Sequence, residues 1–205
     1  MDATPLLRRS QIGPGLSASR ILKWTFPDLA GRLVEISGSG DTAVLTAACA
    51  LIRDAQSRFE PAAWIAAADS TFFPPDAAAS GIDLDALILI RARAVESAAR
   101  AADRLLRSAG FGLIVVDLGK DWNVPLPALA RLCGLARRHH AVVLFITEKS
   151  DTSPSLGSLI SLAAHTRRDR VGGDRFRWSL LVTKDKRGAP ASARSEDCRG
   201  PAGLR

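Results

Sequence analysis

The sequence predicts one α/β domain with a doubly wound, mostly parallel sheet, helices on both faces of the sheet and an antiparallel extension at its C-terminal end. Apolar stretches of strand length alternate with stretches of helical period along most of the chain. Two of the apolar stretches, 113–116 and 141–146, are continuous, which is typical of parallel strands buried on both faces. Such a sheet binds ligands at the carboxyl ends of its strands.

Length and composition indicate a single domain of 205 residues, 47% of them hydrophobic. We expect a flexible N-terminal arm over 1–25, a core domain over 26–190 and a disordered basic tail over 191–205. Charges interrupt every apolar run before the roughly 18 residues that a membrane helix needs. The odd number of cysteines, three, indicates reduced thiols. We therefore expect a cytoplasmic protein, and its high content of Ala and Arg is typical of a GC-rich bacterial gene. Association with the nucleoid is an open option.

The first strand and helix surround a glycine-containing turn. Leu33–Ile36 is a short apolar strand, Ser37–Gly40 is a turn of small residues, and Thr42–Ile52 has the pattern of a buried helix. A phosphate-binding loop occupies this place in P-loop NTPases and needs a lysine, which is absent here. The turn is also about three residues shorter than that motif. The alternative is an ordinary turn in which Asp41 caps the helix.

The later elements follow the same alternation. We expect Asp117 and Glu148 at the ends of two buried strands, where a carboxylate reaches the ligand-binding edge. In order, the expected elements are a strand over 63–67, a loop and short helix over 70–80, a strand over 87–90, a helix over 96–109 stopped by Gly110, a strand over 112–117, a helix over 127–139, a strand over 141–147, and a strand pair over 159–166 and 176–183.

Basic residues gather in the last fifth of the chain. Residues 165–205 hold eleven lysines and arginines against five acids, within a net charge of +7 for the whole chain. Such a segment suits nucleic acid or an acidic protein surface, and a solvated face is the plainer alternative. The candidate DNA-binding or partner-binding residues are Arg167, Arg168, Arg170, Arg175, Arg177, Lys184, Lys186 and Arg187.

Aromatic and imidazole side chains add little chemistry. Trp122 and Trp178 are candidate exposed contact residues, with packing in the core as the alternative. The histidines lack metal-ligand spacing, so we expect no metal site. His139, His140 and His165 are expected to be cationic or solvated.

Five segments together resemble the RecA recombinases, across about residues 26–190. They are GRLVEISG at 31–38, GIDLDAL at 81–87, LIVVD at 113–117, VVLFI at 142–146 and KDKRGAP at 184–190. The resemblance implies a RecA-like P-loop NTPase core. It also implies that LIVVD is the Walker B strand, that VVLFI leads to a DNA-binding loop, and that Lys184 and Lys186 lie near a neighbouring subunit's ATP.

The departures from this family concern its nucleotide site. Asp41 stands where the resemblance expects the phosphate-binding lysine, Ala68 where it expects the water-activating glutamate with Asp69 one position on, and Glu148 where it expects a glutamine. Asp117 retains its acidic role, and we expect Asp41, Asp117 and Glu148 to converge and repel ATP. The degenerate nucleotide site comprises Gly38, Gly40, Asp41, Thr42, Asp117 and Glu148. We therefore expect no catalytic residue, no bound ATP or magnesium and no enzyme activity.

A shortened RecA core of this kind resembles the ImuA branch and, more distantly, the SulA cell-division inhibitors. The ImuA resemblance implies a non-catalytic adaptor in the SOS response to DNA damage that supports error-prone translesion synthesis. Its implied partner is an ImuB-like inactive Y-family polymerase homologue or another replication protein, with single-stranded DNA as a further partner. The alternatives are a DNA-dependent, recombinase-like ATPase and a SulA-like division inhibitor.

Overall fold

The computed structural model describes residues 25–40, 42–67, 70, 72–173, 175–187 and 193–199. Its helices are α2 (Phe26–Leu29), α3 (Val44–Gln56), α4 (Pro74–Ala79), α5 (Val95–Arg107) and α6 (Leu126–His139). Its strands are β1 (Leu33–Gly38), β2 (Ala62–Ala66), β3 (Leu87–Arg91), β4 (Leu113–Gly119), β5 (Val142–Glu148), β6 (Leu162–Gly172), β7 (Arg175–Asp185) and β8 (Ala193–Arg199).

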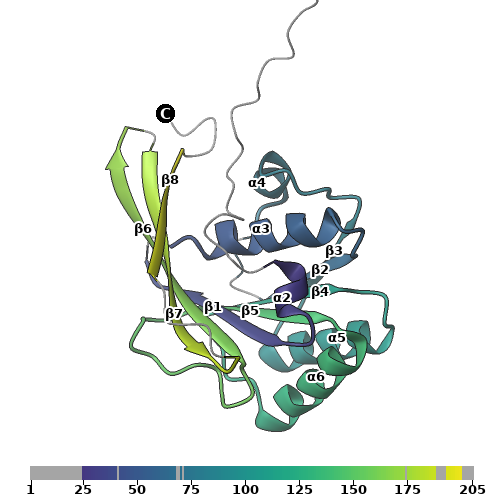
Figure 1. Cartoon of the computed structure of the whole chain (residues 1–205). Coiled ribbons are helices and arrows are strands. Elements are labelled where there is room, and N and C mark those ends of the chain that lie inside the picture. Colours follow the sequence, from purple (N-terminus) through teal and green to yellow (C-terminus); the bar gives the residue numbers. More distant parts are fainter. Residues whose placement is uncertain are drawn as a thin grey trace, which may run out of the picture.

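The strands form one eight-stranded sheet in the order β3-β2-β4-β5-β1-β6-β7-β8. All pairs from β3 to β6 are parallel, whereas β6 with β7 and β7 with β8 are antiparallel. The predicted doubly wound, mostly parallel sheet with an antiparallel extension is therefore confirmed. In Figure 1 the antiparallel strands rise along one side of the molecule, away from α5 and α6.

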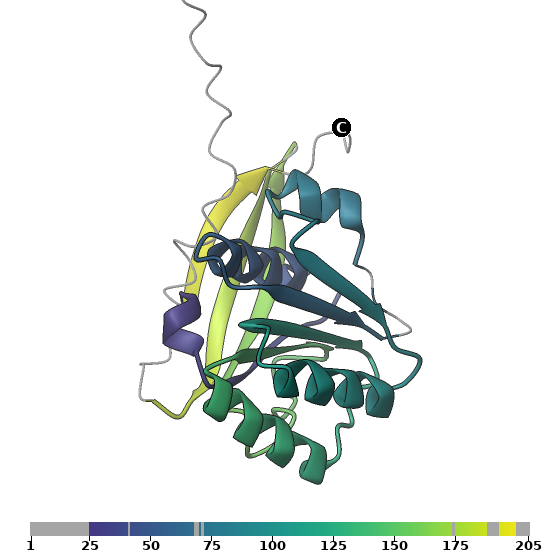
Figure 2. The same cartoon turned by 90° about the vertical axis from the view of Figure 1, so that its right-hand side faces the viewer.

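Helices cover both faces of the sheet. Residues of α2, α3 and α4 pack with Trp64 and Ile36 on one face, and residues of α5 and α6 pack with Ile65 and Phe145 on the other. Figure 2 shows α5 and α6 side by side on their face of the sheet. Strands β1, β2 and β4 are buried along almost their whole length, as a parallel sheet with both faces covered requires.

The predicted helices shift at their ends. Helix α3 begins at Val44 after an Ala43 N-cap, two residues later than the predicted start at Thr42. Helix α5 ends at Arg107, and the left-handed residue after it is Ala109 with φ +53°, whereas the sequence suggested Gly110. The last two predicted strands also lengthen into an eleven-residue pair, Leu162–Gly172 and Arg175–Asp185.

The expected disordered tail over 191–205 contains a strand. Strand β8 pairs antiparallel with β7, and Arg177 binds Asp197 across the pair through Nε and Oδ1 at 2.6 Å. Without β8, strand β7 would be an edge strand with unpaired backbone N–H and C=O groups, and β8 pairs with them. The Gly-, Pro- and Ser-rich composition of the tail does not indicate this strand. No helix in the described part of the chain is long and apolar enough to cross a bilayer.

Candidate functional site

The turn after β1 closes directly onto β6. The Thr42 hydroxyl lies 2.7 Å from the Thr166 hydroxyl, which in turn donates to the Ser37 carbonyl at 3.3 Å. A Cβ added to Gly38 would lie 1.9 Å from Thr42 Oγ1, so only glycine fits between the strand and the turn. The Thr42 hydroxyl therefore already has a partner within the chain. Gly40 has φ +63° and open space around it.

Three predicted positions of this site, Asp41, Ala68 and Asp69, lie outside the described residues. The expected convergence of three acids therefore reduces to Asp117 and Glu148 among the residues that can be placed.

Asp117 lies two residues before the end of β4, which runs on to Gly119, and beside Ala66 of β2 in the register of the sheet. Only 4% of the residue is exposed. The Ser70 hydroxyl donates to Oδ2 at 2.6 Å. Burial raises the pKa of Asp117 above its ordinary value, and the Ser70 hydrogen bond opposes that shift. A carboxyl group is thus held at the carboxyl edge of the sheet without a basic partner among the described residues.

Glu148 ends the neighbouring strand β5 and pairs in register with Gly38 of β1. Its side chain is about half exposed, and its Oε1 lies 3.8 Å from the Lys120 Nζ. Asp117 and Glu148 therefore lie at or near the ends of adjacent strands but have different environments. One carboxyl is buried against a hydroxyl group, and the other faces solvent and a lysine.

A buried ion pair beside this edge was missed by sequence reasoning. Lys149 Nζ lies 2.5 Å from Glu35 Oε1, and the two side chains are 4% and 1% exposed. Glu35 also accepts from Thr147 Oγ1 at 3.1 Å and from the backbone N–H of Leu156 at 2.9 Å. A single glutamate inside the apolar stretch LVEIS was the available signal, because a buried charge needs a partner.

Lys149 also contacts the loop that follows β5. Lys149 Nζ donates to the Pro154 carbonyl at 2.6 Å and lies 4.7 Å from the centre of the Trp122 ring. Trp122 is therefore partly covered, between the exposed and core placements that the sequence allowed. The loop over 150–160 is held by charge against the end of the sheet.

Lys184 and Lys186 bind the same loop. Lys184 Nζ donates to Ser155 Oγ at 3.1 Å and to the Gly157 carbonyl at 3.0 Å. Lys186 Nζ donates to the Ser158 carbonyl at 2.5 Å. Partial burial lowers the pKa of Lys184, and the nearby Lys186 charge adds to that shift. Both lysines thus have partners within this chain.

The remaining arginines of the predicted binding set lie mostly on the β6–β7 pair and are largely partnered. Arg167 binds Asp151 and Arg177 binds Asp197. The Arg168 guanidinium lies 4.3 Å from the centre of the Phe176 ring, and Arg187 reaches the backbone carbonyls of Asp28 and Ala30. Two members of the set, Arg170 and Arg175, form no ion pair within the described residues.

The structure decides the placement of Trp178 and contradicts the expectation for His165. Trp178 is fully buried in the core cluster that also contains residues of α3, because the side chains of β7 alternate between the core and solvent, so the packing alternative holds. His165 is also buried, with Nδ1 lying 3.2 Å from the Ser37 hydroxyl oxygen. Burial lowers the pKa of His165, which favours the neutral ring rather than a cationic or solvated one.

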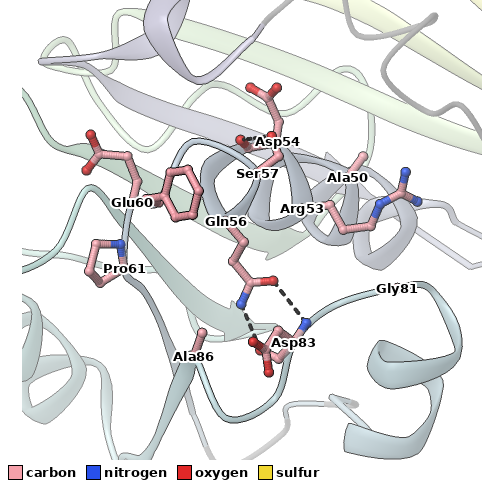
Figure 3. Close-up of a pocket in the computed structure, with 11 residues that line it drawn as sticks. Ala50, Arg53, Asp54, Gln56, Ser57, Glu60, Pro61, Gly81, Asp83 and Ala86 are labelled. Atoms are coloured by element: carbon pink, nitrogen blue, oxygen red, sulfur yellow. Dashed lines mark hydrogen bonds between the residues drawn. The ribbon is translucent and has the colours of Figure 1, made fainter.

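A cavity lies at the opposite end of α3 from the turn after β1. It has a volume of about 830 Å³ and is lined by the C-terminal turn of α3 and by the segments that lead into β2 and β3. Figure 3 shows Gln56 bonded to the backbone of Asp83 across it. Phe59 lines the cavity, is 95% exposed and has a left-handed φ of +62°. The sequence did not indicate this cavity. Among the described residues there is no cluster of side chains that could hold a metal ion.

Comparison with known proteins finds similarity to RecA proteins over part of the chain. Residues 25–122 match the family described as the RecA N-terminal domain. The chain is 36% identical over 137 residues to Protein RecA of Lactobacillus delbrueckii subsp. bulgaricus, across 58% of this chain and 41% of that protein. It is 38% identical over 87 residues to Protein RecA of Picosynechococcus, across 42% of this chain and 25% of that protein. The chain thus spans less than half the length of these relatives.

A solved structure extends the similarity in fold over most of the chain. The crystal structure of the RadB recombinase superposes with a TM-score of 0.64 at 15% sequence identity, covering 87% of this chain and 91% of that chain. This chain therefore has the fold of the RecA-like recombinases and is related in sequence to the RecA N-terminal domain.

Proposed function

We propose that this chain is a non-catalytic RecA-like adaptor in the bacterial response to DNA damage, which supports error-prone translesion synthesis. It acts by binding an ImuB-like inactive polymerase homologue or another replication protein. In this proposal the nucleotide site is degenerate, no ATP or magnesium is bound, and single-stranded DNA is an additional ligand.

The observation that carries the proposal is the closed turn after β1. In P-loop NTPases a threonine or serine hydroxyl in this turn binds Mg²⁺, and a lysine reaches the phosphates. Here the Thr42 hydroxyl is bonded to Thr166, and Gly38 packs against Thr42 with no room for a side chain. Residues 31–52 contain no lysine.

The loop after β5 adds independent support. Lys184 and Lys186 donate to the carbonyls and the hydroxyl of the 155–158 segment, and Lys149 is buried against Glu35. Lys184 and Lys186 thus have hydrogen-bond partners within their own chain, and Lys149 is neutralised by Glu35. Because contacts within the chain already order this loop, it suits a protein-binding surface of fixed shape better than one whose shape depends on bound nucleotide.

A first experiment tests the nucleotide half of the proposal. Wild type and Asp41→Lys are titrated with a fluorescent ATP analogue and Mg²⁺, with and without single-stranded DNA, beside a RecA protein as positive control. We expect no binding by wild type at millimolar nucleotide. Saturable binding by wild type would contradict the proposal, and turnover that Asp41→Lys raises further would favour the DNA-dependent ATPase.

A second experiment tests the partner half. The chain is co-purified with the inactive Y-family polymerase homologue from the same genome and, separately, with the replicative polymerase. We expect a stable complex with at least one of them in the absence of ATP. Failure to bind either protein, together with filamentation of cells that overproduce the chain, would favour the division inhibitor instead.

A further inference from the structure

Helices α5 and α6 carry a group of exposed arginines that the proposed function does not use. The helix arginine surface consists of Arg100, Arg104, Arg107, Arg131 and Arg138. The two helices together contain six arginines but only two carboxylates, Glu96 and Asp103, and neither helix contains a lysine. A surface helix usually alternates the signs of its charges, so this composition is unusual.

The arginines lie along the outward sides of the two helices. Residues 100, 104 and 107 recur at helical spacing, opposite the buried residues Ala98, Ala102 and Leu106, and span about 10 Å along the axis of α5. Arg131 and Arg138 are separated by two turns of α6. Because α5 and α6 pack side by side, as Figure 2 shows, the two rows form one surface.

One carboxylate joins the two rows. Asp103 accepts from Arg107 Nε at 2.8 Å and lies 3.2 Å from Arg131 Nε on the other helix. A single acid thus positions two guanidinium groups and leaves a surplus of positive charge between the helices. In the described residues, Arg100, Arg104 and Arg138 form no ion pair, and like charges at this spacing weaken a helix.

We propose that the helix arginine surface binds the sugar-phosphate backbone of double-stranded nucleic acid. Guanidinium groups bind phosphate oxygens in pairs and are weakly hydrated. A duplex presents one phosphate per about 3.4 Å of axis on each strand, so a 10 Å row of arginines meets two or three phosphates.

The absence of aromatic residues selects the duplex over a single strand. Neither α5 nor α6 contains a phenylalanine, tyrosine or tryptophan. Proteins that bind single strands combine positive charge with aromatic side chains on which bases stack, and this surface offers only the charge. The bound duplex is therefore recognised through its backbone, without preference for sequence.

The surface is separate from the β6–β7 arginines and does not rest on the adaptor role. In the β6–β7 pair Arg167 and Arg177 are neutralised by Asp151 and Asp197, Arg168 lies on an aromatic ring, and Arg170 and Arg175 form no ion pair within the described residues. The helix arginine surface leaves three guanidinium groups without an acid among the described residues. Duplex binding is thus expected whether or not a polymerase homologue is bound.

The test compares two variants that each remove three charges from the full chain. The helix variant is Arg100→Gln/Arg104→Gln/Arg138→Gln, and its matched control is Arg58→Gln/Arg91→Gln/Arg93→Gln, which removes three exposed arginines that belong to neither basic set. Binding of a fluorescent 20-base-pair duplex, of the single strand of the same length and of polyglutamate is measured by anisotropy between 50 and 200 mM KCl. A third variant with lysine at the three helix positions keeps the charge.

We expect wild type to bind the duplex more tightly than the single strand. The helix variant should lose about tenfold in affinity at 100 mM salt, and its salt slope should fall by about 3. The control should stay within about twofold of wild type, and the lysine variant should keep most of the slope. Equal losses in both glutamine variants, tighter binding of the single strand, or binding of polyglutamate but no duplex would each overturn the proposal.

Discussion

The turn after β1 and the loop after β5 leave the same edge of the sheet on neighbouring strands but are stabilised in different ways. The turn after β1 is held by neutral groups, through the Thr42 and Thr166 hydroxyls and a glycine contact. The loop after β5 is held by the buried ion pair of Glu35 and Lys149. Both segments therefore have partners inside the chain, which are hydroxyl groups for the turn and an ion pair for the loop.

The largest expected effect comes from breaking the ion pair. Lys149→Met leaves the Glu35 carboxylate buried without its cation, and we expect the free energy of unfolding to fall by about 3–5 kcal/mol. Urea denaturation measures the loss, and limited proteolysis should show cleavage within 150–160. Adding Glu35→Gln to the lysine variant should recover more than half of the loss. If the double variant is no more stable than the single one, the charge pair is not what holds the loop.

The glycine contact is expected to come next. Gly38→Ala places a methyl group against Thr42 and should destabilise the protein by about 2 kcal/mol. Gly40→Ala is the matched control, because its site is open and only the left-handed backbone resists, at about 1 kcal/mol. Thermal unfolding of both variants should rank them in this order. The reverse order would mean that the turn is looser than the Gly38 contact implies.

The hydroxyl pair should contribute less. Thr42→Val removes one of the two hydroxyls, while Thr166 keeps its bond to the Ser37 carbonyl, so we expect a loss of about 1 kcal/mol. Thr42→Ser preserves the hydroxyl and should lie close to wild type in the same chemical denaturation. A valine variant as stable as the serine variant would show that the hydroxyl contact has no energetic role.

The smallest effect concerns pH. Burial raises the pKa of Asp117, so the folded state holds this proton more tightly than the unfolded chain. Wild-type stability therefore falls as pH rises from the ordinary aspartate pKa through the raised one, and the penalty persists at neutral pH. Asp117→Asn removes the charge and keeps an acceptor for Ser70, so its melting temperature should exceed that of wild type at pH 7. The difference should shrink below pH 4, and a constant difference would contradict this assignment.

The fold could be predicted because the signals that specify it are local. Continuous apolar stretches such as 113–116 and alternation with helical periods determine the parallel sheet, and both survive in the structure. The ends of elements were less accurate, because they depend on contacts of single residues such as Ala43 and Ala109. Strand β8 was missed because its pairing with β7 depends on a partner strand rather than on its own composition.

The candidate site was less predictable, since it depends on which distant side chains meet. The sequence placed Asp117 and Glu148 at strand ends, but not that one is buried and the other exposed. It grouped Lys184, Lys186 and the arginines as a free basic surface, whereas most of them have partners within the chain, and those of Lys184, Lys186 and Arg167 lie in the loop after β5. The number of charged residues can be counted in a sequence, but the groups that pair with them in the fold cannot be identified from it.

The buried pair of Glu35 and Lys149 also constrains how this chain can change over generations. Replacing either residue alone leaves the other as a buried charge without a partner, which strongly lowers stability. Replacing both with apolar residues changes stability little. Selection should therefore remove single replacements at these positions and tolerate paired ones. Among descendants of the same ancestor, these two positions should therefore vary together, although Glu35 lies in β1 and Lys149 follows β5 in a distant part of the chain.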